Sequence, residues 1–190
     1  KCAVADIPYG GSKGGIAVDA SKLSRGELER LTRKYTTLLF PLVGPHIDIP
    51  APDVNTNEEV MAWFMDTYSL LSGELTLGVV TGKPVALGGS LGRREATGRG
   101  ILIVAREVAK RLGRDLRGAS VAVQGAGNVG GTAALLLARE GCRVIAISDS
   151  SGAIHNPDGL DVEAVLSFLR AEHGRRLKDS PDRALCGYPT

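Results

Sequence analysis

The chain has 190 residues, of which 43% are hydrophobic, and its formal net charge at pH 7 is +2. These values are typical of a soluble globular protein with one large or two small domains. The sequence contains no basic cluster and no apolar run long enough to cross a bilayer. We therefore expect no nucleic-acid partner and no membrane partner.

The cysteines and histidines, three of each, are widely spaced along the chain. Their spacing matches neither a metal site nor a disulfide framework. We therefore expect reduced thiols, no bound metal and a cytoplasmic location. The chain begins at Lys1 instead of Met and has no closing element at its end, so we expect it to be a piece of a longer polypeptide.

A glycine-rich turn comes first in the chain. We expect strands over Cys2–Ile7 and Ile16–Val18, and between them Lys13 is flanked by four glycines. Glycine lets a backbone approach a ligand closely, so the ammonium of Lys13 is placed to reach a bound anion or carbonyl. A surface hairpin with a solvated lysine explains the same residues equally well.

Two capping boxes predict the next helices. Ser24-Arg25-Gly26-Glu27 opens a helix that runs to about Phe40, and Thr56-Asn57-Glu58-Glu59 opens one from Asn57 to about Leu71, before Gly73. Apolar residues recur on one side of each helix, and we expect these stripes to face a core. The stripes comprise Leu28, Leu31, Tyr35 and Leu38 in the first helix and Val60, Phe64, Tyr68 and Leu71 in the second.

A proline-rich segment precedes the second of these helices. Ile49-Pro50-Ala51-Pro52 is predicted to be stiff and extended, because proline restricts both itself and the residue before it. It delivers Asp53 at a fixed position, as a general acid or base requires. A carboxylate that caps a helix or stabilises a turn is the alternative.

The second half of the chain contains a nucleotide-binding pattern. We place a domain boundary near Thr81 and a helix over about 97–112. Ser120–Val123 then reads as a strand, followed by G-x-G-x-x-G, a helix from Thr132 to about Glu140, a strand over Val144–Ile147, and Asp149. The expected cofactor contacts are Gly125, Ala126, Gly127, Asn128, Val129, Gly130 and, at the ribose, Asp149.

The glycines have separate roles in this pattern. Gly125 permits a tight turn, Gly127 lets a pyrophosphate approach, and Gly130 lets the helix pack close to the strand. After Asp149 we expect a turn at 156–159, a helix from about Leu160 to His173 and a polar tail. This is too few strands for a complete doubly wound sheet, so we expect an α/β fold with only part of such a domain.

Several segments in order resemble the glutamate, leucine, phenylalanine and valine dehydrogenase family, and most closely its glutamate enzymes. The resemblance covers nearly the whole chain to about Lys178. It is carried by KCAVADIPYGGSKGG, IPAPDVNTNEEVMAWFMDTYS, TGKPVALGGSLGRREATGRG, VAVQGAGNVG and AISDSSGAIHNPDGLD. It implies that residues 1–80 are the later part of a substrate and dimerisation domain, and that residues 81–190 begin an NAD(P)-binding Rossmann domain.

The resemblance also implies reversible oxidative deamination of L-glutamate to 2-oxoglutarate and ammonia in a hexamer. Lys13 matches the lysine that activates water and polarises the keto group, and Asp53 matches the acid/base. Lys1 matches a lysine that binds the substrate α-carboxylate. Thr97 and Asn128 match positions that hold the nicotinamide carboxamide, and a role in the site is left open for Arg93 or Arg94.

Two choices stay open on the sequence. Asp149 favours the ribose 2′-hydroxyl of NAD, whereas Ser150 and Ser151 can donate to the 2′-phosphate of NADP, so the cofactor is NAD or NADP. The substrate side chain is open because the family's side-chain pocket residues fall outside these 190 residues. A leucine, phenylalanine or valine dehydrogenase and a non-catalytic nucleotide-binding module are the alternatives.

Overall fold

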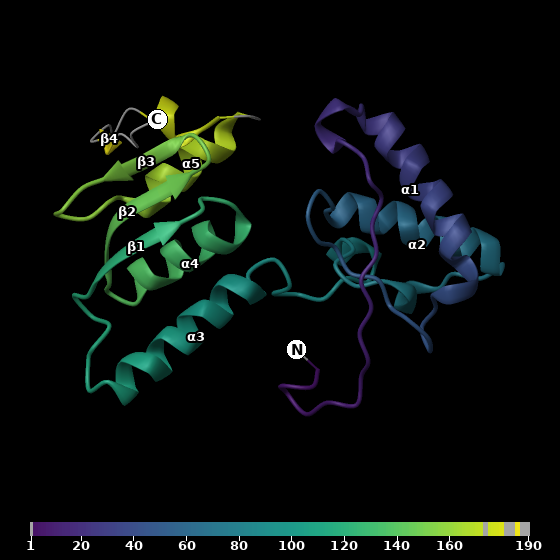
Figure 1. Ribbon diagram of the computed structural model, residues 1–190, viewed down its shortest axis with the longest axis horizontal. Helices are drawn as coiled ribbons and strands as arrows, with labels where there is room; N and C mark the ends of the chain where they lie inside the picture. Colours follow the sequence, from purple (N-terminus) through teal and green to yellow (C-terminus); the bar gives the residue numbers. More distant parts are fainter. Residues whose placement is uncertain (1, 173–174, 181–184, 187–190) are drawn as a thin grey trace. The chain divides into compact units, whose positions relative to one another are not determined.

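The computed structural model describes residues 2–172, 175–180 and 185–186. The chain forms two compact units, Lys1–Leu91 and Gly92–Thr190 (Figure 1). The first unit runs to Leu91, past the position near Thr81 where we expected a boundary. The backbone N–H of Thr81 donates to the carbonyl of Pro50 at 2.9 Å, which ties this segment to the first unit. Gly82 lies directly against the ring of Pro52. No helix in the described ranges is long and apolar enough to cross a membrane.

The first unit contains two helices of 15 residues each, α1 (Arg25–Leu39) and α2 (Glu58–Ser72), which pack against each other. These bounds confirm the helices predicted from the capping patterns. Short 3₁₀ turns cover Ala20–Lys22, Phe40–Leu42, Leu77–Val79 and Val85–Leu87. The core lies between α2 and the segments beside it, and comprises Val43, Met61, Phe64, Met65, Val79 and Val80.

The stripe predicted on α1 is only partly confirmed, because Leu28, Leu31 and Tyr35 are half-buried and Tyr35 packs against the core. Thr32 and Thr36 are the buried residues of α1, whereas Leu38 is exposed. Each threonine hydroxyl donates to the carbonyl four residues earlier, at 2.8 Å for Thr32 and 2.9 Å for Thr36. These bonds satisfy the hydroxyls, so small polar residues can be buried where two helices approach closely.

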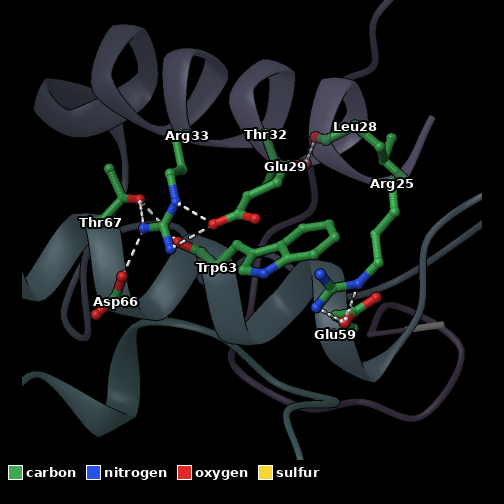
Figure 2. A network of polar contacts seen from close by, with 9 residues as sticks. All are labelled: Arg25, Leu28, Glu29, Thr32, Arg33, Glu59, Trp63, Asp66 and Thr67. Atoms are coloured by element: carbon green, nitrogen blue, oxygen red, sulfur yellow. Dashed lines mark hydrogen bonds and ion pairs between the residues drawn. The ribbon is translucent and has the colours of Figure 1, made fainter. Parts of the chain in front are cut away.

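A polar network joins the outer parts of α1 and α2 (Figure 2). Arg33 pairs with Glu29 on its own helix and with Asp66 on α2, and it also donates to the hydroxyl of Thr67 at 3.0 Å. At the other end, Arg25 pairs with Glu59 and lies over the ring of the buried Trp63. The network links the side chains of the two helices at two places along their length. Trp63 itself is buried between these polar contacts and the core.

The helix caps agree with the prediction at one site and correct it at the other. Ser24 and Glu27 form the expected capping box of α1. At α2 the cap is Asn57 and not Thr56, because the Asn57 amide oxygen accepts from the backbone N–H groups of Glu59 and Val60. Gly73 ends α2 in the left-handed conformation, as predicted.

The two strands predicted before α1 are not present. Residues 2–6 form turns, and residues 16–18 are irregular. A strand is stable only when its backbone groups pair with a neighbouring strand, and none of the described residues pairs with these segments. Their apolar side chains are correspondingly exposed, including Val4, Ile16 and Val18.

The second unit is a mixed α/β structure. Its elements are α3 (Ala96–Arg111), β1 (Ser120–Gln124), α4 (Asn128–Arg139), β2 (Arg143–Asp149), β3 (Gly152–His155), α5 (Val162–Ala171) and β4 (Leu185–Cys186). The sheet order is β1-β2-β3-β4; β1 and β2 are parallel and the later pairs are antiparallel. The strands β3 and β4 were not predicted.

The core of the second unit lies between the sheet and the helices α4 and α5. It contains Ala134, Val144, Ile147, Ile154, Val162, Val165, Leu166 and Leu177. A second cluster joins α3 to α4 through Leu102 and Leu137. Apolar side chains of α3 and of its end are exposed, among them Ile101, Val104, Val108 and Leu112.

Candidate functional site

The two residues predicted to be catalytic are in direct contact. The Lys13 ammonium forms an ion pair with the Asp53 carboxylate, although forty positions separate them in the sequence. Both side chains are open to solvent, with 79% of Lys13 and 57% of Asp53 exposed. An exposed pair of this kind contributes little to stability. The first unit thus presents a cation and a carboxylate side by side, accessible to a small ligand.

The lysine segment lies close to a side chain of α1. A Cβ atom added at Gly14, the residue after Lys13, would lie 2.8 Å from the hydroxyl oxygen of Tyr35. Tyr35 is half-buried and packs against the core of the first unit. A side chain at Gly14 would therefore require the Tyr35 hydroxyl to shift, whereas Gly10, Gly11 and Gly15 have open space around them.

The segment that carries Asp53 is held from both sides. The Thr56 hydroxyl accepts from the backbone N–H of Asp53 at 2.6 Å and donates to the carbonyl of the same residue at 2.8 Å. The Asp53 carboxylate accepts from the backbone N–H of Val54 at 2.8 Å. Before it, Pro50 and Pro52 are fixed by Thr81 and Gly82. The predicted rigid delivery of Asp53 therefore has an observed structural basis.

The glycine pattern of the second unit has the geometry of a phosphate cradle. Gly125 has a φ of +97°, which makes the tight turn after β1. A Cβ atom at Gly130 would lie 1.9 Å from the carbonyl oxygen of Gly125, whereas one at Gly127 would meet nothing within 4 Å. The helix α4 starts at Asn128, directly after Gly127 and earlier than predicted. An open space before a helix N-terminus fits an anionic dinucleotide.

The start of α3 lies against the start of α4. A Cβ atom at Gly98 would lie 2.7 Å from the Thr132 side chain, and the Asn128 side-chain amide donates to the carbonyl of Arg94 at 3.1 Å. Thr97, next to Gly98, is exposed at this corner. The structure thus brings Thr97 and Asn128 to the same end of the glycine cradle.

Asp149 lies at the carboxyl end of β2 and is already hydrogen-bonded within the chain. One carboxylate oxygen accepts from the backbone N–H and the hydroxyl of Ser151, both at 2.6 Å. The other accepts from the backbone N–H of Leu177 at 2.9 Å. Burial raises the pKa of Asp149, but these hydrogen bonds and the charge of Arg176 outweigh it and hold the pKa below its usual value.

A cation that we did not identify from the sequence lies beside this carboxylate. The Arg176 guanidinium donates to the hydroxyl of Ser150 at 2.5 Å. Arg176 belongs to the segment predicted only as a polar tail, and no motif in that segment indicated a contact with Ser150. The Gly125 backbone N–H donates to the carbonyl of Ser148 at 2.8 Å, which ties the glycine turn to the same end of β2.

The remaining predicted residues have less structural context. Lys1 lies outside the described residues. Arg93 and Arg94 are exposed in the turn before α3. Among the residues that the structure describes, no group of three or more His, Cys, Asp or Glu side chains is arranged to hold a metal.

Comparisons with known proteins cover both units. The family described as "Glutamate/Leucine/Phenylalanine/Valine dehydrogenase" matches residues 88–187. The family described as "Glu/Leu/Phe/Val dehydrogenase, dimerisation domain" matches residues 1–70. The two matches follow the order in which the two units occur in the chain.

Individual relatives are similar over most of this chain. A glutamate dehydrogenase from Thermotoga maritima is 57% identical over 92% of this chain and 42% of its own length. The NAD-specific enzyme of Clostridioides difficile is 51% identical, over 93% of this chain and 43% of its own length. The NADP-specific enzyme A1 of Halobacterium salinarum is 56% identical, over 88% and 40%. The chain thus spans about two fifths of the length of these relatives.

A solved structure agrees with these sequence matches. The hetero-hexameric glutamate dehydrogenase of Thermus thermophilus, in a leucine-bound form, matches with a TM-score of 0.86 and 52% identity. The match covers 92% of this chain and 42% of that one. With its paired lysine and carboxylate, its glycine cradle and these matches, the chain belongs to the glutamate, leucine, phenylalanine and valine dehydrogenase family.

Proposed function

We propose that the protein catalyses the reversible oxidative deamination of L-glutamate to 2-oxoglutarate and ammonia with NAD or NADP. The observation that carries this proposal is the contact between Lys13 and Asp53. Relatives named glutamate dehydrogenase at 51–57% identity support the substrate. In this proposal the first unit is part of the substrate domain, and the second is the beginning of a Rossmann domain.

The cofactor cradle is formed by residues of the second unit. Gly125, Gly127 and Gly130 give the turn, the open approach and the close helix packing that a bound pyrophosphate requires. Asn128 and Thr97 lie at the end of this cradle and would hold the carboxamide. A nicotinamide held there would supply the hydride acceptor for the Cα–H bond of the amino acid.

Lys13 and Asp53 divide the remaining chemistry between them. Loss of hydride leaves an iminium carbon, which water must attack before ammonia can leave. The Lys13 ammonium stabilises the negative charge that develops on the oxygen and orients the water. Asp53 takes a proton from the attacking water and then gives it to the departing nitrogen. Because Lys13 and Asp53 are in direct contact, both groups can act on the same small substrate.

The assembly is proposed to be oligomeric. The match to a dimerisation domain and the hetero-hexameric Thermus thermophilus structure support a hexamer of the whole protein. A cytoplasmic location is proposed from the free thiols of Cys2 and Cys142.

Initial rates on the whole protein test the substrate. We expect kcat/KM for L-glutamate to exceed that for L-leucine and L-phenylalanine by about 10²-fold or more, since a pocket with polar groups for a carboxylate rejects an apolar side chain. A higher value for leucine or phenylalanine would assign the protein to a sister enzyme. Cofactor binding without turnover of any of the three would indicate a non-catalytic module.

The Thr56 hydroxyl gives a second test, because it holds both the N–H and the carbonyl of Asp53. We expect Thr56→Val to lower kcat by about 3- to 10-fold, the equivalent of one neutral hydrogen bond. The control is Ser24→Ala, which removes the α1 cap and lowers stability without touching the Asp53 segment. Equal effects of the two variants on kcat would show that Thr56 acts only through stability.

A further inference from the structure

A short segment of the first unit, residues 81–84, is anchored in the core of that unit. It directly follows Val79 and Val80, whose side chains are buried in the core. The Lys83 ammonium donates to the carbonyl of Val80 at 2.9 Å, so the segment is closed by one of its own side chains. Its position is therefore set by the packing of the core.

The residues after this segment fold back onto it. The backbone N–H of Gly89 donates to the carbonyl of Pro84 at 3.0 Å. A Cβ atom at Gly89 would collide with the carbonyl oxygen of Lys83, so the backbone of the two residues is in close contact. The 81–84 segment is thus confined by the residues on both sides of it.

Two contacts join the 81–84 segment to the prolines that precede Asp53. The backbone N–H of Thr81 donates to the carbonyl of Pro50 at 2.9 Å. A Cβ atom added at Gly82 would lie 2.5 Å from Cγ and 2.6 Å from Cδ of Pro52. The Pro52 ring therefore occupies the space that a side chain at position 82 would need.

The Pro52 ring cannot turn away from such a side chain. It is closed onto its own backbone nitrogen, and ordinary contact begins near 3.4 Å, so ring and backbone would have to retreat by about 1 Å. Asp53 is the next residue, and its backbone is held on the other side by the Thr56 hydroxyl. A displacement of Pro52 would therefore reach the Asp53 carboxylate.

We propose that Gly82 is a positioning residue, which acts through Pro52 to place the Asp53 carboxylate against the Lys13 ammonium. The absent side chain is what lets the Pro52 ring lie against the 81–84 segment. This inference rests on the proposed function, because it takes Asp53 as the acid/base of that reaction. Gly82 itself has no contact with the reacting atoms in this scheme. A shift of about 1 Å in a reacting group can lower a rate by on the order of 10²-fold.

Gly82→Ala in the whole protein tests the proposal. We expect kcat for L-glutamate to fall by about 10- to 10²-fold, because the added methyl group displaces Pro52 and with it Asp53. The KM for glutamate should stay within about 2-fold, since the lost interaction belongs to the chemical step and not to substrate binding. Initial rates over a range of glutamate concentrations measure both quantities.

Gly73→Ala is the matched control in the same unit. Gly73 has a φ of +77°, close to the +71° of Gly82, but a Cβ atom there would meet nothing within 4 Å. Alanine therefore introduces the same left-handed backbone strain without a collision. We expect a lower thermal midpoint for this variant and a kcat within about 2-fold of the wild type.

A double variant separates positioning from stability. Pro52→Ala removes Cγ and Cδ and leaves only a Cβ, which lies 3.8 Å from the Cβ position at Gly82, an ordinary contact. In the presence of Pro52→Ala, we expect Gly82→Ala to change kcat by less than about 2-fold relative to Pro52→Ala alone. The thermal midpoint should nevertheless fall, because the backbone strain at position 82 remains.

The outcomes distinguish this inference from the proposed function. Wild-type kcat in Gly82→Ala, an equal loss in Gly73→Ala, or a loss that persists in the double variant would each show that Gly82 does not position Asp53, even where glutamate is turned over. If Gly82→Ala alone does not fold, folding and turnover in the double variant support the collision with Pro52, and their absence overturns it. A wild-type protein that oxidises no amino acid with NAD or NADP would overturn the proposed function, and this inference with it.

Discussion

Replacing Lys13 by alanine in the whole protein is expected to lower kcat by at least about 10²-fold, the scale of a lost electrostatic or acid–base group. The ammonium is in direct contact with Asp53 and is the cation proposed to stabilise charge on the attacking oxygen. Its exposed ion pair contributes little to stability, so the thermal midpoint should hardly change. Initial rates with glutamate, together with a thermal unfolding curve, measure both quantities.

A second lysine–aspartate pair in the same unit provides the control. Lys22 pairs with Asp19 at 3.3 Å, and both side chains are exposed like those of Lys13 and Asp53. Lys22→Ala should leave kcat within about 2-fold of the wild type, as most surface substitutions are mild. The Kd for the cofactor should be unchanged in both variants, since the glycine cradle lies in the other unit. Turnover of Lys13→Ala near the wild-type rate would refute the proposed role of Lys13.

Gly130→Ala is expected to destabilise the second unit by about 2–3 kcal/mol, the upper part of the usual range for overpacking. The new Cβ atom would meet the carbonyl oxygen of Gly125 at 1.9 Å, and this is backbone that cannot rotate away. For a unit of this size the thermal midpoint should fall by roughly 10–20 °C. Differential scanning calorimetry measures this change.

Gly127→Ala separates ligand approach from packing. Gly127 has a φ of −72°, which alanine adopts without strain, and its Cβ would lie in open space. The thermal midpoint should therefore stay near that of the wild type, while the Kd for NADPH rises by about 10-fold because the methyl group meets the pyrophosphate. Wild-type affinity in this variant would contradict the proposed position of the pyrophosphate. A wild-type midpoint for Gly130→Ala would contradict the close contact between α4 and β1.

Local chemistry explains which parts of the structure were predictable. The ends of α1 and α2 follow from Ser24 and Gly73, whose side-chain bonds and backbone angles depend only on nearby residues. The glycine turn at Gly125 is local in the same sense, because its positive φ is available to glycine at little cost. These features were read correctly from the sequence.

Packing decided the features that were missed. Periodicity located an apolar stripe on α1, but which side of a helix is buried depends on its neighbours. On α1 the buried side carries Thr32 and Thr36, whose hydroxyls are satisfied within the helix. The strands expected at residues 2–7 and 16–18 lack a pairing partner among the described residues, whereas β3 forms because β2 is present to pair with it.

The sequence by itself determined the family, the helix ends and the identity of the lysine, the aspartate and the glycines that carry the proposed chemistry. Only the tertiary structure decided that Lys13 contacts Asp53, that Thr56 holds the Asp53 backbone, and that Arg176 reaches Ser150. The reason is distance along the chain: caps and turns are set by residues within a few positions, whereas these contacts join segments that only the packed core of each unit brings together.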